Sequence, residues 1–147
     1  MTSSDSDPVI GNLEMITDGR KSGTDGTYLE LKPGPQSVVI DLERKCTIYA
    51  ILVWHYIKEA RSYAGVVVQV ADDPDFIVNV RTLFNNDSQN EGGNGIGKDP
   101  RYVETNEGRL IDARGAEARY VRLFSNGSNM TPANHYIEVE VFGQVRP

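Results

Sequence analysis

Cysteine is nearly absent from this chain, since Cys46 is the only one among 147 residues. A single cysteine excludes an intrachain disulfide, so cysteine usage indicates neither an oxidising nor a reducing compartment. Cys46 begins an apolar, β-branched run, and we expect it to be a buried structural thiol. A catalytic thiol needs a positioned base, and neither histidine is adjacent to Cys46 in the sequence.

Long apolar runs are also missing. No stretch approaches the roughly 20 apolar residues that a membrane-spanning helix needs. The first residues, MTSSDSDP, have neither the basic nor the apolar segment of a secretion signal. Residues 1–8 are rich in Ser and Asp, and we expect a flexible lead-in there. The chain length suits one domain, which we place at residues 9–147.

Basic residues are in the minority, because 15 Lys and Arg stand against 21 Asp and Glu, for a formal net charge of -6. Nucleic-acid binding requires a concentrated basic face, so this balance argues against it. Catalytic motifs are missing as well: the chain has two histidines, no serine flanked by glycines in a nucleophile elbow, and no H-E-x-x-H motif. We therefore expect a protein that is not an enzyme.

Short β-branched and aromatic runs dominate what is present. CTIYAILVWHYI is typical of a strand buried on both faces, and the closing stretch 118–143 consists of two alternating runs, ARYVRLF and HYIEVEVFG, joined by a polar loop. We expect these two runs to be an antiparallel pair. In the second run Ile137, Val139 and Val141 share one side and two glutamates share the other. About eight strands and no amphipathic helix predict an all-β sandwich or jelly roll.

The closing stretch resembles the discoidin family, the coagulation factor five/eight type C domains, in which RYVR is followed by a loop and an E-hydrophobic-E-V-aromatic-G ending. The similarity extends through ITDGRKSGTDGTYLEL and SVVIDLERKCTIYAILVWHYI. With VVVQVADDPDF and FNNDSQN, the layout from residue 12 to 143 looks like bacterial carbohydrate-binding modules of family thirty-two. Animal members usually carry a cysteine pair, which this chain lacks.

This resemblance implies a galactose-binding-like jelly-roll β-sandwich with a structural calcium ion and a sugar site built from loops at one end. It also implies an extracellular or cell-surface location, with the domain appended to or associated with a larger extracellular protein. The implied partner is a glycan or polysaccharide.

The calcium site can be argued from chemistry. Calcium takes six to eight hard oxygen ligands, so it favours an acidic, glycine-bearing loop that faces a carboxylate from another element. The usual D-G-D of the family is Asp-Gly-Arg at residues 18–20, so one oxygen must come from elsewhere in the loop. Asp-Gly pairs are also ordinary turn residues, and that interpretation stays open. The expected calcium ligands are Asp18, Thr24, Asp25, Thr27 and Glu138.

A sugar site needs an aromatic face and a few hydrogen-bonding groups on rigid loops. Three loops offer such groups: the loop after the long apolar run, the closing loop, and the glycine-rich loop 85–99, which we expect to be long and exposed. Trp54 is expected in the core. A hydrogen-bonded role at a strand end is an equal alternative for His135. The candidate sugar ligands are His55, Tyr56, Arg61, Asn86, Asn126, Asn129 and His135.

Two functions follow from these observations. The first is a non-catalytic carbohydrate-binding module that recognises extracellular glycan through loops at one end of a calcium-stabilised sandwich. The second is a protein-interaction or assembly module of discoidin type without sugar binding. The acidic net charge disfavours polyanionic glycans overall, but basic residues can gather locally: Arg20, Lys21, Lys58, Arg61, Lys98 and Arg101.

Overall fold

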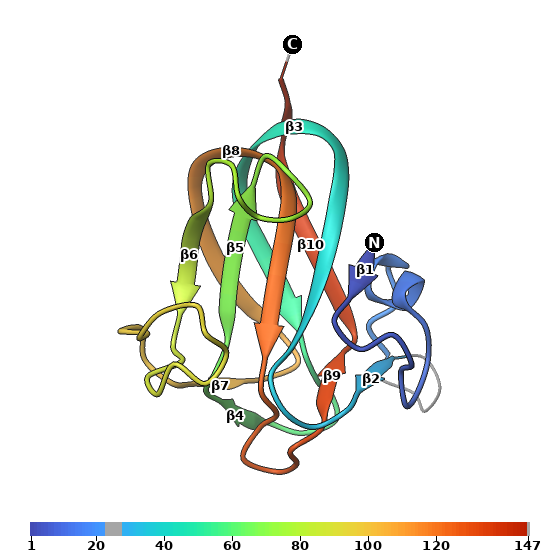
Figure 1. Cartoon of the computed structure of the whole chain (residues 1–147). Coiled ribbons are helices and arrows are strands. Elements are labelled where there is room, and N and C mark those ends of the chain that lie inside the picture. Colours follow the sequence, from blue (N-terminus) through green and yellow to red (C-terminus); the bar gives the residue numbers. More distant parts are fainter. Residues whose placement is uncertain (23–27, 147) are drawn as a thin grey trace.

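The chain folds into an antiparallel β-sandwich, as the sequence predicts (Figure 1). The computed structural model describes residues 1–22 and 28–146. Within these ranges the one helix, η1 (Leu13–Thr17), is a single 3₁₀ segment, and no helix is long and apolar enough to cross a membrane. The strands are β1 (Thr2–Ser3), β2 (Leu29–Leu31), β3 (Gln36–Trp54), β4 (Arg61–Tyr63), β5 (Val67–Ala71), β6 (Arg81–Asn85), β7 (Tyr102–Glu104), β8 (Arg109–Ser125), β9 (Asn134–Tyr136) and β10 (Glu138–Val145).

Two long strands, β3 and β8, hold both halves of the sandwich together. They pair with each other along most of their length, and the register shifts between Asp41 and Cys46 and again between Ile48 and Ala50. Register shifts of this kind bend a strand and increase its twist. Both strands therefore arch over the upper end in Figure 1, so that one arm of β3 pairs with β1 and the other with β10.

The two closing runs are not paired with each other. β8 lies between β3 and β5, whereas β10 pairs with the far arm of β3, from Glu138 opposite Trp54 to Val145 opposite Cys46. The first three residues of the second run form the separate strand β9, which pairs with β2. The expectation of a closing antiparallel pair was therefore wrong, because alternation identifies strands but does not identify their partners.

The core lies between the two arms of the arch. Val121, Leu123 and Val139 are buried there as expected, and Val141 is half-buried against the same cluster. Trp54 is also buried, in a smaller cluster with Tyr28 and Ile137. Its indole N–H donates to the carbonyl of residue 106 at 3.0 Å, so the side chain is both packed and hydrogen-bonded.

The first residues are attached to the sandwich. Thr2 pairs with Val39 of β3, and the Asp5 carboxylate accepts the backbone N–H of Lys32 at 2.9 Å and its ammonium at 3.0 Å. The hydrogen bond from the Lys32 backbone lowers the pKa of Asp5. The expected flexible lead-in thus contains paired backbone and a buried carboxylate. Cys46 is half-buried rather than buried, and its thiol donates to the Arg44 carbonyl at 3.3 Å.

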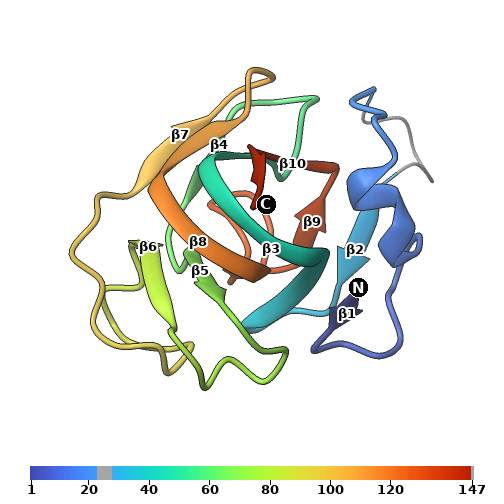
Figure 2. The same ribbon diagram turned by 90° about the horizontal axis from the view of Figure 1, so that it is seen from above.

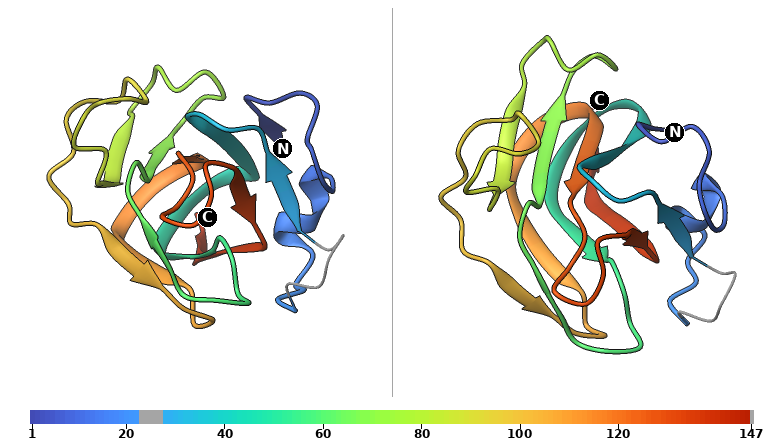
Figure 3. Two further views of the ribbon diagram at one scale, coloured as in Figure 1. Left: turned by 90° about the horizontal axis from the view of Figure 1, so that it is seen from below. Right: turned by 60° about the horizontal axis from the view of Figure 1, so that its bottom comes forward.

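Loops converge at the lower end of the sandwich. Seen from above, β5 and β6 lie on one side and β1, β2 and η1 on the other (Figure 2). The short pairs β4–β7 and β2–β9 close the lower end, and the connections 55–60, 86–101 and 126–133 meet there (Figure 3). The turn between β5 and β6 lies at the opposite end (Figure 1).

Candidate functional site

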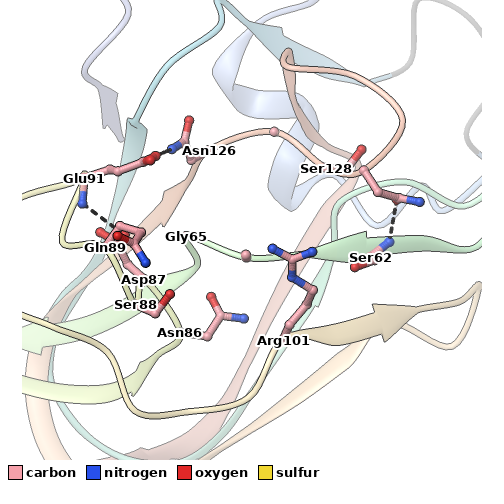
Figure 4. Close-up of a pocket in the computed structure, with 13 residues that line it drawn as sticks. Ser62, Gly65, Asn86, Asp87, Ser88, Gln89, Glu91, Arg101, Asn126 and Ser128 are labelled. Atoms are coloured by element: carbon pink, nitrogen blue, oxygen red, sulfur yellow. Dashed lines mark hydrogen bonds between the residues drawn. The ribbon is translucent and has the colours of Figure 1, made fainter.

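A cavity of about 340 Å³ opens among the converging loops (Figure 4). This volume is at the lower end of the range for small-molecule sites, about 300–1,000 Å³. Its walls come from the end of β4 and the residues after it, from the loop after β6, and from the loop after β8. None of the lining residues is aromatic: they are Ser62, Ala64, Gly65, Asn86, Asp87, Ser88, Gln89, Glu91, Arg101, Asn126, Gly127, Ser128 and Asn129.

The glycine-rich loop forms one wall and is more ordered than its composition predicts. The buried Asp87 carboxylate accepts the backbone N–H groups of Glu91 at 3.0 Å and Gly92 at 2.8 Å. At the base of the loop, Asn85 and Asp99 are joined by two hydrogen bonds, one between backbone groups at 2.9 Å and one from the Asn85 N–H to the Asp99 carboxylate at 2.7 Å. The prediction of a long exposed loop was wrong for the first residues of the loop, Asn85, Asn86 and Asp87, whose buried side chains fix the backbone through hydrogen bonds.

Asn86 connects this wall to its neighbours. Its side-chain oxygen accepts the Val66 N–H at 2.7 Å, and its amide nitrogen donates to the carbonyls of Tyr63 at 3.0 Å and Pro100 at 3.2 Å. Both amide hydrogens are therefore used within the protein. Asn86 lines the cavity, and its hydrogen bonds position the walls.

The loop after β8 is fastened to both other walls. The Asn129 side-chain oxygen accepts the Ser62 N–H at 2.7 Å, and the Asn129 backbone N–H donates to the Ser62 carbonyl at 3.0 Å. On the other side, the Asn126 amide donates to the Glu91 carboxylate. Gly65 has a φ of +77°, and a Cβ there would lie 2.9 Å from the Asn126 Cβ, so the close approach of these two walls requires glycine.

Arg101 differs from these fastened residues. Its side chain is exposed and makes no hydrogen bond or ion pair within residues 1–22 and 28–146. Figure 4 shows its guanidinium on the same side of the cavity as Ser62, with Glu91 and Asn126 on the opposite side. Among the described residues, the pocket therefore presents an unpaired cation, Arg101, on the side opposite the Glu91 carboxylate.

His55 lies in the core and does not line the cavity. Its Nδ1 is 2.8 Å from one Glu104 carboxylate oxygen, and its backbone N–H donates to the other at 2.7 Å. The ring stacks on Tyr63 with centroids 4.7 Å apart. Only 1% of His55 and 1% of Glu104 are exposed, so the pair is structural and has no route to a ligand.

Tyr56, Arg61 and His135 contact one another and do not line the cavity. The Arg61 guanidinium lies 3.6 Å from the Tyr56 ring centroid and 3.4 Å from the His135 Nδ1. Because Arg61 can only donate, His135 Nδ1 accepts and its Nε2–H donates to the Glu30 carboxylate at 2.7 Å. Burial lowers the pKa of His135, and Glu30 opposes this shift. Alternation along β4 explains the separation, since Ser62 faces the cavity while its neighbours Arg61 and Tyr63 are buried.

The sequence thus predicted two separate sets of residues as one site. Asn86, Asn126 and Asn129 line the cavity, and the other four candidates do not. The residues missed by sequence reasoning are mainly polar loop residues, and Arg101 was noted only as a member of a basic group. Its position at the exit of the glycine-rich loop, after Pro100, is the only local signal.

Glu138 is the part of the predicted calcium site that the structure describes most fully. It is buried, and one carboxylate oxygen accepts the Gly19 N–H at 3.0 Å. The other, Oε1, has no hydrogen-bond partner within the described residues. Burial raises the pKa of Glu138 to about 7, against the effect of the Gly19 hydrogen bond. An unpartnered buried carboxylate oxygen is what a hard cation would bind.

The rest of that prediction has less support. Asp18 accepts the Arg20 N–H at 2.8 Å, which is the ordinary turn interaction of an Asp-Gly sequence. Thr24, Asp25 and Thr27 lie outside the described residues. Among residues 1–22 and 28–146, no three His, Cys, Asp or Glu side chains are grouped as a metal site.

Comparison with known proteins gives structural matches alone: no family model and no curated protein matches the sequence. The CBM32 module of AlyQ, solved in complex with 4,5-unsaturated mannuronic acid, superposes with a TM-score of 0.67 at 19% identity, over 96% of this chain and 93% of that one. Chitosan-binding module 1 of a Paenibacillus chitosanase/glucanase, solved as a selenomethionine-labelled point mutant, superposes with a TM-score of 0.64 at 22% identity. The match covers 97% of this chain and 92% of that module.

A family 89 glycoside hydrolase from Clostridium perfringens gives a TM-score of 0.69 at 18% identity, over 98% of this chain. The present chain spans only 14% of the length of that enzyme. These matches establish the fold: the chain has the β-sandwich of CBM32 modules, as the resemblance to discoidin domains implies.

Proposed function

We propose that this domain is a non-catalytic carbohydrate-binding module that binds extracellular glycan in the cavity at its loop end. The observation that carries the proposal is the polar cavity itself, whose three walls are fixed to one another by hydrogen bonds. A prearranged site loses little conformational entropy on binding, which suits a ligand recognised mainly through hydroxyl groups. Two structural neighbours support it, because the CBM32 module of AlyQ was solved in complex with a sugar and the other is a chitosan-binding module.

In this role the domain holds an attached or associated enzyme, or a cell surface, to its polysaccharide. The Clostridium perfringens hydrolase, in which a matching segment occupies a small part of a much longer chain, is consistent with such an arrangement. Affinity is expected to be modest, in the range of about 1 mM to 1 μM, or roughly -4 to -8 kcal/mol. Several modules on one protein would raise the overall affinity.

A calcium ion is the second part of the proposal. Glu138 Oε1 fits a cation, since it is buried and unpartnered in the described part of the chain. Asp18, which raises the pKa of Glu138 through its charge, is the described acid of the predicted ligand set that would share the ion. The ion would neutralise this acidic pair and fasten the N-terminal loop to β10, so its contribution is to stability.

A glycan array tests the binding function directly. The domain should retain a defined set of glycans, and the variant Ser88→Trp should lose them because the indole fills the cavity. The matched control is Val78→Trp, which places the same side chain at a half-exposed position in the turn between β5 and β6, at the opposite end of the sandwich. Absence of any retained glycan, with and without calcium, would refute the proposal and favour the assembly module.

A further inference from the structure

We propose that the cavity selects a sugar unit that carries an anionic substituent, a carboxylate or a sulfate, bound by Arg101. This inference rests on the proposed function, since it specifies the ligand of the same cavity. It goes beyond that function because a polar cavity alone does not distinguish neutral, acidic and amino sugars.

The first support is the unpaired state of Arg101. Some arginines are neutralised within the protein: Arg61 pairs with Glu59 at 2.8 Å, and Arg119 binds Asp41 through two nitrogens. Arg101 lines the cavity and makes no such contact within residues 1–22 and 28–146. A guanidinium presents a planar pair of N–H donors that matches a carboxylate or a sulfate, and a neutral hydroxyl does not use both.

The two acids of the cavity are committed to the opposite wall. Each Asp87 oxygen accepts a backbone N–H of its own loop, and one Glu91 oxygen binds the Asn126 amide. Neither makes an ion pair with Arg101, and Figure 4 shows Glu91 across the cavity from it. The cavity therefore has two poles, one cationic and one that accepts hydrogen bonds.

A sugar unit with one anionic group fits both poles. The anion binds Arg101, while ring hydroxyls donate to the second Glu91 oxygen, which has no partner among the described residues, and to the Asn126 side-chain oxygen. No aromatic ring lines the cavity, so charge and hydrogen bonds set the orientation of the sugar. The net charge of -6 acts weakly here, because charges farther away than about 8 Å are screened at physiological salt.

The test measures binding by isothermal titration calorimetry to oligogalacturonate, to the same oligosaccharide with its carboxylates reduced to alcohols, to a sulfated galactan oligosaccharide, and to a chitosan oligosaccharide. At least one acidic ligand should have a dissociation constant about 10-fold or more below that of the neutral ligand, and this difference in affinity should shrink at high salt. Tighter binding of oligogalacturonate would identify the anionic substituent as a carboxylate, and tighter binding of the sulfated galactan would identify it as a sulfate.

Substitutions identify the residue responsible. Arg101→Gln should weaken acidic-sugar binding by about 10- to 100-fold, and Arg101→Lys should retain part of it. Lys98→Gln is the matched control: it removes the same charge from the same loop at an exposed position that does not line the cavity, and binding should be unchanged. Melting temperatures should agree among these variants, because neither side chain has a partner to lose in the described part of the chain.

Four results would overturn the inference. If Arg101→Gln binds the acidic ligand as tightly as the wild type, or if the neutral oligosaccharide binds equally well, the anion has no role and the glycan-binding function still stands. If the chitosan oligosaccharide binds best and Glu91→Gln abolishes that binding, the cavity selects a cationic sugar. If no glycan binds in calorimetry or on the array, the proposed function itself fails.

Discussion

The pair formed by His55 and Glu104 is predicted to be a major stabilising contact that plays no part in ligand binding. In Glu104→Ala, the His55 backbone N–H and its Nδ1 lose their acceptors at 2.7 and 2.8 Å while remaining in the core. Each buried unpaired donor costs about 1–3 kcal/mol, and breaking a buried hydrogen-bonded pair typically costs about 3–5 kcal/mol. We therefore expect the free energy of unfolding to fall by about 3–5 kcal/mol.

Urea unfolding at pH 7 measures this change. For a domain of this size about 4 kcal/mol corresponds to a loss of roughly 10 °C in melting temperature. Glu104→Gln, which keeps an oxygen acceptor, should lose less, and the control Val103→Ala, at an exposed position of the same strand, should change stability by less than about 1 kcal/mol. A Glu104→Ala variant within about 1 kcal/mol of the wild type would refute the structural assignment of His55 and return it to the list of sugar ligands.

Three further predictions test other parts of the structure. Gly65→Ala should destabilise the domain by about 1–3 kcal/mol and weaken glycan retention, because the added Cβ meets the facing loop at 2.9 Å; unchanged retention would contradict the close approach. Calcium should raise the melting temperature of the wild type and not of Glu138→Gln, and an equal response of both would exclude Glu138 as a ligand. Burial lowers the pKa of His135, which lies between Glu30 and Arg61, so unfolding takes up a proton at acidic pH. The free energy of unfolding should therefore fall as the pH drops below about 6.5. A His135→Gln variant with the same dependence on pH in urea unfolding would contradict this.

The sequence predicted the fold class well because alternation is a local property. The runs around Val121 and Val139 alternate strictly, and both residues are buried in the sandwich. Strand partners were less predictable, since β10 pairs with a strand more than 80 positions earlier in the chain. Two register shifts that bend β3 bring these segments together, and nothing in local composition specifies them.

The site was predicted in part for the same reason. Asn86, Asn126 and Asn129 do line the cavity, because polar loops at one end of a sandwich converge, and their role as sugar ligands stays a prediction. His55 and Arg61 were chosen for their chemistry, but both are buried: His55 directly follows β3 and contacts Glu104, and Arg61 on β4 contacts His135. The exposed and unpaired state of Arg101 within the described residues depends on the fold of a glycine-rich loop around Asp87, which composition alone indicated to be open.

The most direct test of the central claim is amide chemical-shift mapping of the domain during titration with an acidic oligosaccharide. The structure predicts shifts at residues 62–65, 86–91 and 126–129 and at Arg101, the four segments that line the cavity. Shifts centred instead on Tyr56 and His135, or on the outer faces of the sheet, would contradict the placement of the glycan in this cavity.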